Sequence, residues 1–276
     1  VEYGFDGVEL RGIRGELHLP VVPELSARPQ EVREFFAANK IELVCLGSSA
    51  TLTARKQADL AKQKAQLSEF IELAGKLGCP FVRILAGEAP GLDNSRAALS
   101  RLAEQLITLA PEAARNNVTL LVENGGDFPD STSLWFLVDA VSHPSVRCCW
   151  NQFIGRTVPE RATNSLPRLG YRMGLVHLCD AKFDERNLIT SYVSLGQGDL
   201  EIARQVEILR GLAYEGYLMF EWPKLWMDAL PGPEQVLPGA VKILREKLAE
   251  KQPVLSAYKG DKNAPRFRSR PVTSST

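Results

Sequence analysis

The chain has 276 residues, enough for two average domains or for one large α/β barrel. It has 33 lysine and arginine residues and 33 aspartate and glutamate residues, so its net charge is zero. A basic surface for nucleic-acid phosphates is therefore not expected. Hydrophobic residues make up 45% and charged residues 24%, as in compact globular proteins. Because no apolar run is long enough to span a bilayer, we expect no membrane contact and a cytoplasmic protein.

Strand-like and helix-like segments alternate along the whole chain. Strand 7–11 precedes helix 28–40, strand 41–49 precedes helix 54–78, and strand 80–87 precedes helix 95–117. Gly78 is expected to end the second of these helices. Strand 118–124 then precedes helix 132–142, and strand 146–151 precedes a weaker helix near 157–168. Strand 173–181 precedes helix 200–213, and strand 216–222 precedes helix 233–251. We count seven β/α units.

The predicted strands are nearly continuous apolar runs, which is typical of a parallel sheet covered on both faces by helices. No GxGxxG motif follows the first strand, and polar residues end many strands rather than two neighbouring ones. Both features favour a closed (β/α)8 TIM barrel over an open doubly wound sheet. Because residues 1–6 resemble the end of a helix, we expect a barrel over 1–254 that lacks its first strand. Residues 255–276 are polar and aperiodic, and we predict a flexible tail.

The five cysteines are odd in number and show no CxxC spacing, and each lies in or beside an apolar run. We interpret them as small buried side chains of a reducing compartment, without disulfide or metal roles. The chain has only three histidines, His18, His143 and His177. A site that requires a cluster of imidazoles is therefore excluded.

Polar side chains end the last four predicted strands, where a β/α barrel carries its chemistry. Glu123, Asn151, His177 and Glu221 are separated by about one β/α repeat each. Two carboxylates, an amide oxygen and an imidazole form a mixed donor set for Mn²⁺, Mg²⁺ or Co²⁺, with Zn²⁺ as a further option. Taken singly, each residue has an equally ordinary explanation, as a helix cap, an ion-pair partner or a core histidine.

Further polar and aromatic residues near the strand ends are candidates for substrate binding: Glu9, Glu88, Lys182, Arg186 and Trp222. Lys182 and Arg186 would bind a phosphate or a hydroxyl group, or else belong to a solvated loop. In SLGQGDLEIARQ at 194–205, backbone amides would cradle an anion, or else form a tight turn before a helix capped by Asp199.

Six segments in order resemble the xylose isomerase-like barrels, specifically the sugar phosphate isomerase/epimerase group. These are YGFDGVELRG at 3–12, LGCPFVRILAG at 77–87, VTLLVENG at 118–125, VHLCDAK at 176–182, LGQGDLEI at 195–202 and GYLMFEW at 216–222. The resemblance implies a divalent metal held by residues matching Glu123, Asn151, His177 and Glu221. The family usually has Asp at the second position, with a His a few residues later, so Asn151 implies weaker metal binding.

The resemblance also implies an isomerase or epimerase that moves a proton next to a sugar carbonyl through an enediolate. Glu123 and Glu221 would then serve as acid and base as well as metal ligands. Alternatives are a dehydratase or lyase acting on an inositol-like ketone, and a degenerate member that binds a sugar without turning it over. An abasic-site endonuclease, from a related branch, is disfavoured by the three histidines and zero net charge. We expect a small sugar or polyol as partner, with a homo-oligomer possible.

Overall fold

A computed structural model describes residues 1–88 and 95–250, which contain a seven-stranded sheet with all neighbouring strands parallel. Its strands follow one another in chain order: β1 (Gly7–Leu10), β2 (Glu42–Gly47), β3 (Phe81–Leu85), β4 (Thr119–Glu123), β5 (Val146–Asn151), β6 (Met173–Leu178) and β9 (Tyr217–Phe220). All seven strands predicted from the apolar runs are present.

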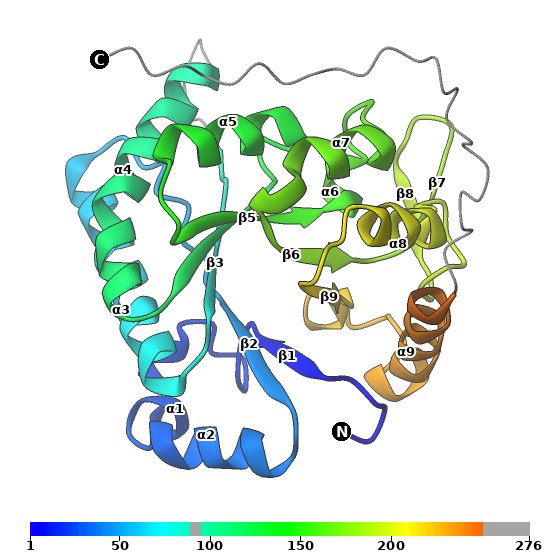
Figure 1. The fold of residues 1–276 in the computed structure, drawn as a ribbon, viewed down its shortest axis with the longest axis horizontal. Coiled ribbons are helices and arrows are strands. Elements are labelled where there is room, and N and C mark those ends of the chain that lie inside the picture. Colours follow the sequence, from blue (N-terminus) through cyan, green and yellow to red (C-terminus); the bar gives the residue numbers. More distant parts are fainter. Residues whose placement is uncertain (89–94, 251–276) are drawn as a thin grey trace, which may run out of the picture.

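Helices follow the strands and lie around the outside of the sheet (Figure 1). They are α1 (Pro23–Ser26), α2 (Pro29–Ala38), α3 (Gln57–Leu77), α4 (Ser95–Arg115), α5 (Ser131–Val141), α6 (Gln152–Gly155), α7 (Ala162–Leu169), α8 (Ile202–Gly211) and α9 (Pro233–Ala249). Short 3₁₀ turns lie at η1 (Leu19–Val21), η2 (Gly170–Arg172) and η3 (Pro223–Leu225). Gly78 ends α3 in the left-handed region with φ +68°, as its position predicts.

The sheet curves into a nearly closed TIM barrel, which confirms the predicted fold class. β6 is buried along its whole length, whereas β1 and β9 are only half-buried at every residue. The reason is that β1 and β9 are the two edges of the sheet and each has a neighbour on one side only. Seven strands in this order fit an eight-stranded barrel whose first strand is not among the described residues.

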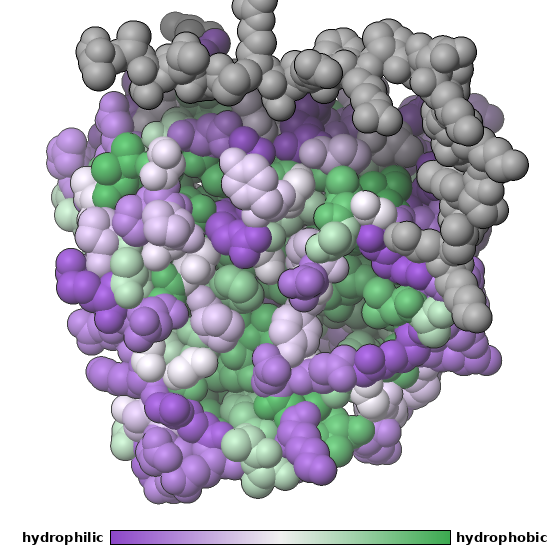
Figure 2. All heavy atoms as spheres, in the orientation of Figure 1, coloured by the Kyte–Doolittle hydropathy of each residue, from purple (hydrophilic) through white to green (hydrophobic). Residues whose placement is uncertain are grey.

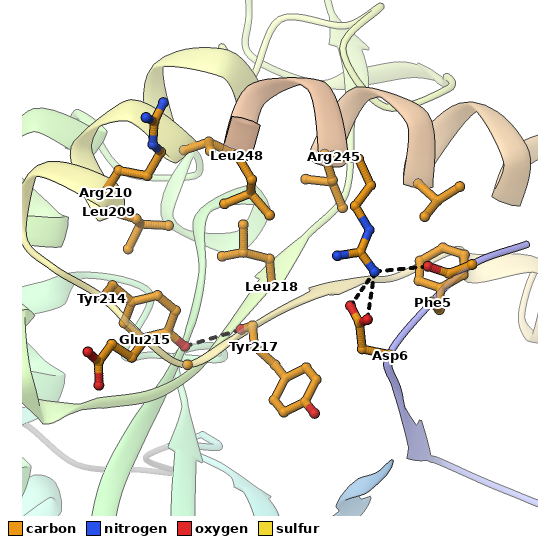
Figure 3. A pocket seen from close by; sticks show the side chains of 15 residues that line it. Phe5, Asp6, Leu209, Arg210, Tyr214, Glu215, Tyr217, Leu218, Arg245 and Leu248 are labelled. Atoms are coloured by element: carbon orange, nitrogen blue, oxygen red, sulfur yellow. Dashed lines mark hydrogen bonds and ion pairs between the residues drawn. The ribbon is translucent and has the colours of Figure 1, made fainter. Parts of the chain in front are cut away.

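A cavity of about 330 Å³ lies between the two edges of the sheet (Figure 3). The cavity is enclosed by residues 4–6, β9, α8 and α9. Arg245 of α9 donates to the Asp6 carboxylate at 2.6 Å and to the Gly4 carbonyl at 3.0 Å. An ion pair therefore holds the start of the chain against α9 at this side of the barrel.

The core has two parts, a large one between strands and helices and a small one inside the barrel. The inner part consists of apolar side chains from β2, β4, β5 and β6: Val44, Cys45, Leu121, Cys149 and Leu175. All five cysteines of the chain are buried. This apolar layer fills the barrel interior below the polar side chains nearer the mouth.

Polar residues occupy much of the rim of the face drawn in Figure 2, and apolar side chains show between them. No helix in the described ranges combines the length and the apolar character needed to cross a membrane.

Residues 1–4, predicted as the end of a helix, form a turn closed by a 3.0 Å bond from the Gly4 amide to the Val1 carbonyl. Two local predictions are wrong. An antiparallel hairpin of β7 (Ala181–Phe183) and β8 (Ile189–Tyr192) follows β6, where no hairpin was predicted, because its strands are short and polar. The N-cap position of α8 is Glu201, whose side chain makes no capping hydrogen bond, and the predicted cap Asp199 accepts from the Phe183 amide instead. The predicted tail lies outside the described residues.

Candidate active site

The carboxyl ends of β4, β5, β6 and β9 meet at one mouth of the barrel, and each brings one of the four predicted side chains. Glu123 and Asn151 are the last residues of β4 and β5, His177 is the penultimate residue of β6, and Glu221 directly follows β9. Glu123 pairs in register with Cys149, two residues before Asn151, and Asn151 pairs with His177. Residues two apart on a strand face the same side, so these side chains share the barrel interior.

The four side chains converge within hydrogen-bonding distance. The Asn151 Nδ2 group donates to Glu123 Oε1 at 3.0 Å and to Glu221 Oε2 at 2.9 Å. His177 Nδ1 lies 2.9 Å from Glu123 Oε1 and 3.1 Å from Glu221 Oε1. The Glu221 side chain is 37% exposed, whereas that of Glu123 is 5% exposed. Glu221 is therefore the carboxylate of this group that a molecule in the mouth meets first.

Two further charged side chains, Glu9 and Arg83, complete this cluster. Arg83 donates from Nε to Glu9 Oε1 at 2.8 Å and from Nη1 to Glu123 Oε2 at 2.7 Å. Glu9 Oε2 lies 2.9 Å from His177 Nε2. Gly47 leaves the space that this requires, because a Cβ there would be 2.6 Å from Glu9 Oε1 and 2.8 Å from Arg83 Nη2. Arg83 was not among the predicted site residues, although an arginine within the buried run FVRIL was a signal for it.

The ion pairs control the charges of the buried groups. Burial by itself raises the pKa of Glu123, but Arg83 and His177 outweigh burial and lower that pKa to about 2. Burial likewise opposes ionisation of Glu9, and the same two partners bring its pKa well below the usual value. Burial lowers the pKa of His177, whereas Cys149, Glu221, Glu9 and Glu123 raise it well above the usual value. The cluster thus pairs the Glu9 and Glu123 carboxylates with the Arg83 guanidinium and with a His177 ring whose protonated form is favoured, so a metal bound at His177 Nδ1 would have to displace a proton.

Two of the four predicted residues, Glu123 and His177, belong to a buried group whose ligand atoms lie close enough together to hold a metal ion, and the third member of that group is Cys149 rather than Glu221. Glu221 Oε1 lies 3.1 Å from His177 Nδ1, and Glu9 holds the other ring nitrogen of His177, as an outer-shell carboxylate does in metal sites. Asn151 differs from the expectation, because its Oδ1 accepts from the Phe153 amide at 3.1 Å and its NH₂ group faces the carboxylates. In this arrangement Asn151 contributes hydrogen-bond donors rather than a ligand oxygen.

Cys149 lies beside Glu123 and His177 in the barrel interior. Its Sγ and the ligand atoms of Glu123 and His177 all lie within 4.8 Å of one another, so this buried trio could hold a metal. Burial raises the pKa of the Cys149 thiol to about 12, so metal binding there would displace a proton. Cys149 was predicted to have no such role, because nothing in its local spacing distinguishes it from the other buried cysteines.

A cavity of about 580 Å³ opens above the cluster. Its lining includes the aromatic side chains of Phe153, Tyr192, Trp222 and Trp226. Phe153 stacks on Tyr192 with ring centroids 5.4 Å apart, and the Tyr192 ring meets Trp222 edge-on at 6.5 Å. The cavity is large enough for a monosaccharide-sized molecule, whose apolar faces pack well against aromatic rings.

Of the predicted substrate-binding residues, Glu9 and Trp222 line this cavity and three do not. Glu88 is exposed and lines a separate small hollow beside α4. Lys182 and Arg186 lie exposed on the unpredicted β7–β8 hairpin, where Arg186 pairs with Asp184 at 3.3 Å. The hairpin carries both basic side chains away from the mouth cavity.

The glycine-containing loop at 194–205 forms a tight turn. The buried Asp180 carboxylate accepts from the amides of Gly196 at 2.8 Å and Gly198 at 2.9 Å, and from the Leu200 amide at 3.3 Å. These amides already have an anionic partner within the protein. Of the two explanations offered by the sequence, the turn is therefore the one that the hydrogen bonds support.

Comparison with known proteins defines the class. The family model described as "Xylose isomerase-like TIM barrel" matches residues 1–247, and the chain belongs to this family. No match was found among curated proteins.

Solved structures with the same fold include two sugar epimerases and a dehydratase. The 3-keto-D-glucoside 4-epimerase YcjR from E. coli has 16% identity and a TM-score of 0.70, covering 89% of this chain and 90% of that one. A D-psicose 3-epimerase from Clostridium cellulolyticum H10 has 15% identity and a TM-score of 0.72, covering 90% of each chain. The "probable 3-DHS dehydratase AsbF" from Bacillus anthracis has 16% identity and a TM-score of 0.71, covering 88% of this chain and 90% of that one.

Proposed function

We propose that the protein is a sugar or sugar phosphate isomerase/epimerase that transfers a proton next to a carbonyl through an enediolate. The convergence of Glu123, Asn151, His177 and Glu221 below an aromatic-lined cavity carries this proposal. The epimerase names of two proteins with this fold support it.

We assign the proton transfers to Glu221 and Glu123. Glu221 is the more accessible carboxylate, so it takes the proton from the carbon beside the carbonyl. Return of that proton to the neighbouring carbon interconverts ketose and aldose. Delivery of a proton to the opposite face of the same carbon inverts that centre instead; Glu123, which Arg83 and His177 keep ionised in the resting site, would first take up that proton from solvent. The Asn151 NH₂ group and Arg83 hold these carboxylates in place while their protonation changes.

Glu123, His177 and Glu221 are the residues that would hold a divalent ion. When bound, the ion would polarise the substrate carbonyl as a Lewis acid. We propose Mn²⁺, Mg²⁺ or Co²⁺ in this position, with Zn²⁺ favoured if the Cys149 sulfur takes part. Glu9 fixes the His177 ring through its second nitrogen, which orients the imidazole toward the two glutamates.

Solvent deuterium exchange tests the proposal and does not require the product to be identified. The protein, incubated with Mn²⁺ in D₂O, is mixed with D-fructose, D-psicose or L-ribulose, or with their phosphates, and ketose C–H signals are followed by NMR. Loss of a signal beside the carbonyl is expected with at least one sugar. Glu221→Gln should abolish the loss, and Glu104→Gln, an exposed position on α4, should not. Binding of a sugar without exchange would instead identify a non-catalytic member of the family.

A dehydratase is the second candidate, favoured by the shared fold with AsbF. It would begin with the same proton abstraction by Glu221, but the intermediate would then expel the hydroxyl group on the next carbon as water. Mass spectrometry of the reaction separates the two candidates, because isomerisation keeps the substrate mass and dehydration lowers it by one water.

A further inference from the structure

Among the described residues, two arginines line the mouth cavity, Arg11 and Arg83, and they differ in their partners. Arg83 is bonded to two carboxylates, those of Glu9 and Glu123, and its side chain is only 5% exposed. Arg11, one residue past β1, also lines the cavity and is half-buried. No carboxylate of the described residues lies within ion-pair distance of Arg11. Arg11 is thus a cation of this cavity whose charge the described part of the chain does not pair.

The contacts of Arg11 position it without neutralising it. Nη2 donates to Ser49 Oγ at 2.7 Å and Nη1 donates to the Gly47 carbonyl at 3.4 Å, both uncharged acceptors. The Trp226 ring lies 5.8 Å from the guanidinium carbon and supports one face of the group. A guanidinium has five N–H donors, so it retains donors for a further ligand while these contacts hold its orientation.

Arg11 also lies beside the charged cluster. The position that a Cβ on Gly47 would take is 3.1 Å from Arg11 Cδ and 2.6 Å from Glu9 Oε1. Arg11 and Glu221 both line the cavity of about 580 Å³, so a single small molecule in it can contact both side chains. Lys182 and Arg186 do not line this cavity.

We propose that Arg11, held by Ser49 and supported by Trp226, forms a subsite for an anionic group at the end of the sugar substrate distal to the reacting carbon. The substrate is then a sugar acid or a sugar phosphate rather than a neutral sugar. A carboxylate and a phosphate share the oxygen pair that a guanidinium binds in a fork. This inference rests on the proposed function for the identity of the ligand as a sugar.

Three six-carbon ketoses that differ only at C6 provide the test: D-fructose, D-fructose 6-phosphate and D-fructuronate. Their dissociation constants are measured by calorimetry with the Mn²⁺-incubated protein. We expect one of the two anionic ketoses to bind at least about tenfold more tightly than D-fructose, since charge-assisted hydrogen bonds have this strength. The ketose that binds more tightly shows whether the anionic group of the substrate is a carboxylate or a phosphate.

Three variants assign the preference to Arg11. Arg11→Gln should remove the advantage of the anionic ketose over D-fructose, and an unchanged circular dichroism spectrum and melting temperature show that the variant is folded. Arg11→Lys should keep part of the advantage, because it keeps the charge but loses the fork. Arg115 is exposed at the far end of α4, and Arg115→Gln makes the same charge change away from the mouth. This control variant should keep the whole affinity advantage of the anionic ketose.

Equal binding of all three ketoses, or an anion advantage that survives Arg11→Gln, would overturn the proposal. Deuterium exchange separates this failure from failure of the proposed function. Exchange with D-fructose and no anion preference contradicts only the anionic subsite. Arg11-dependent anion binding without exchange of any ketose contradicts only the proton-transfer chemistry.

Discussion

Replacement of Arg83 by methionine removes the buried cation that joins Glu9 to Glu123. Methionine fills a similar length of space without charge, so the main effect is to leave two buried carboxylates without their guanidinium partner. Removal of one partner of a buried ion pair costs about 3–5 kcal/mol. We expect a loss of this size in the free energy of unfolding at pH 7.

Urea denaturation in the presence of EDTA, followed by circular dichroism, measures this free energy for the metal-free protein. A second variant, Arg83→Met with Glu9→Gln, should recover part of the loss because it removes one of the unpaired charges. A loss below about 1 kcal/mol, within the range of exposed ion pairs, would refute the inference that Arg83 neutralises a desolvated cluster.

The same denaturation repeated at low pH tests the sign of the linkage. The folded pKa of Glu123 is lowered from 4.5 to about 2, so its contribution is fully present above pH 4.5 and is lost as pH falls toward 2. The stability difference between wild type and Arg83→Met should therefore shrink over this pH range. A difference that stays constant would mean that Glu123 does not depend on Arg83 for its ionisation.

Four further changes have definite expected outcomes. Asn151→Asp adds a charge between Glu123 and Glu221, so it should lower the melting temperature in EDTA and raise the Mn²⁺ content measured by mass spectrometry; unchanged metal content would show that this position does not limit binding. Gly47→Ala places a Cβ 2.6 Å from Glu9 Oε1 and should cost about 1–3 kcal/mol in urea denaturation, whereas a neutral result would mean that Glu9 moves freely. Asp180→Ala frees the Gly196 and Gly198 amides and should speed proteolysis at 194–200, with the rest of the chain as internal reference. Gly78→Ala forces a side chain into φ +68° and should cost about 1 kcal/mol; a stabilised protein would contradict that backbone angle.

The sequence by itself determined the alternation of strands and helices and the residues that end each strand. Continuous apolar runs identify the strands and their ends, because a strand covered on both faces must be apolar throughout. In a parallel barrel all strands end at one mouth, so the positions of Glu123, Asn151, His177 and Glu221 followed from the order of the runs. Lys182 and Arg186 could not be placed in this way, because the short polar β7–β8 hairpin has no periodic signal.

Only the tertiary structure decided how these side chains meet. Arg83 belongs to an apolar run and becomes a partner of Glu9 and Glu123 because β1, β3 and β4 curve around a common axis. The orientation of the Asn151 side-chain amide depends on a hydrogen bond from the Phe153 backbone amide, which lies beyond the end of β5. Composition and residue spacing do not predict this hydrogen bond. Charge pairing and hydrogen-bond direction depend on distances of about 3 Å between residues far apart in the chain, and the closure of the barrel sets those distances.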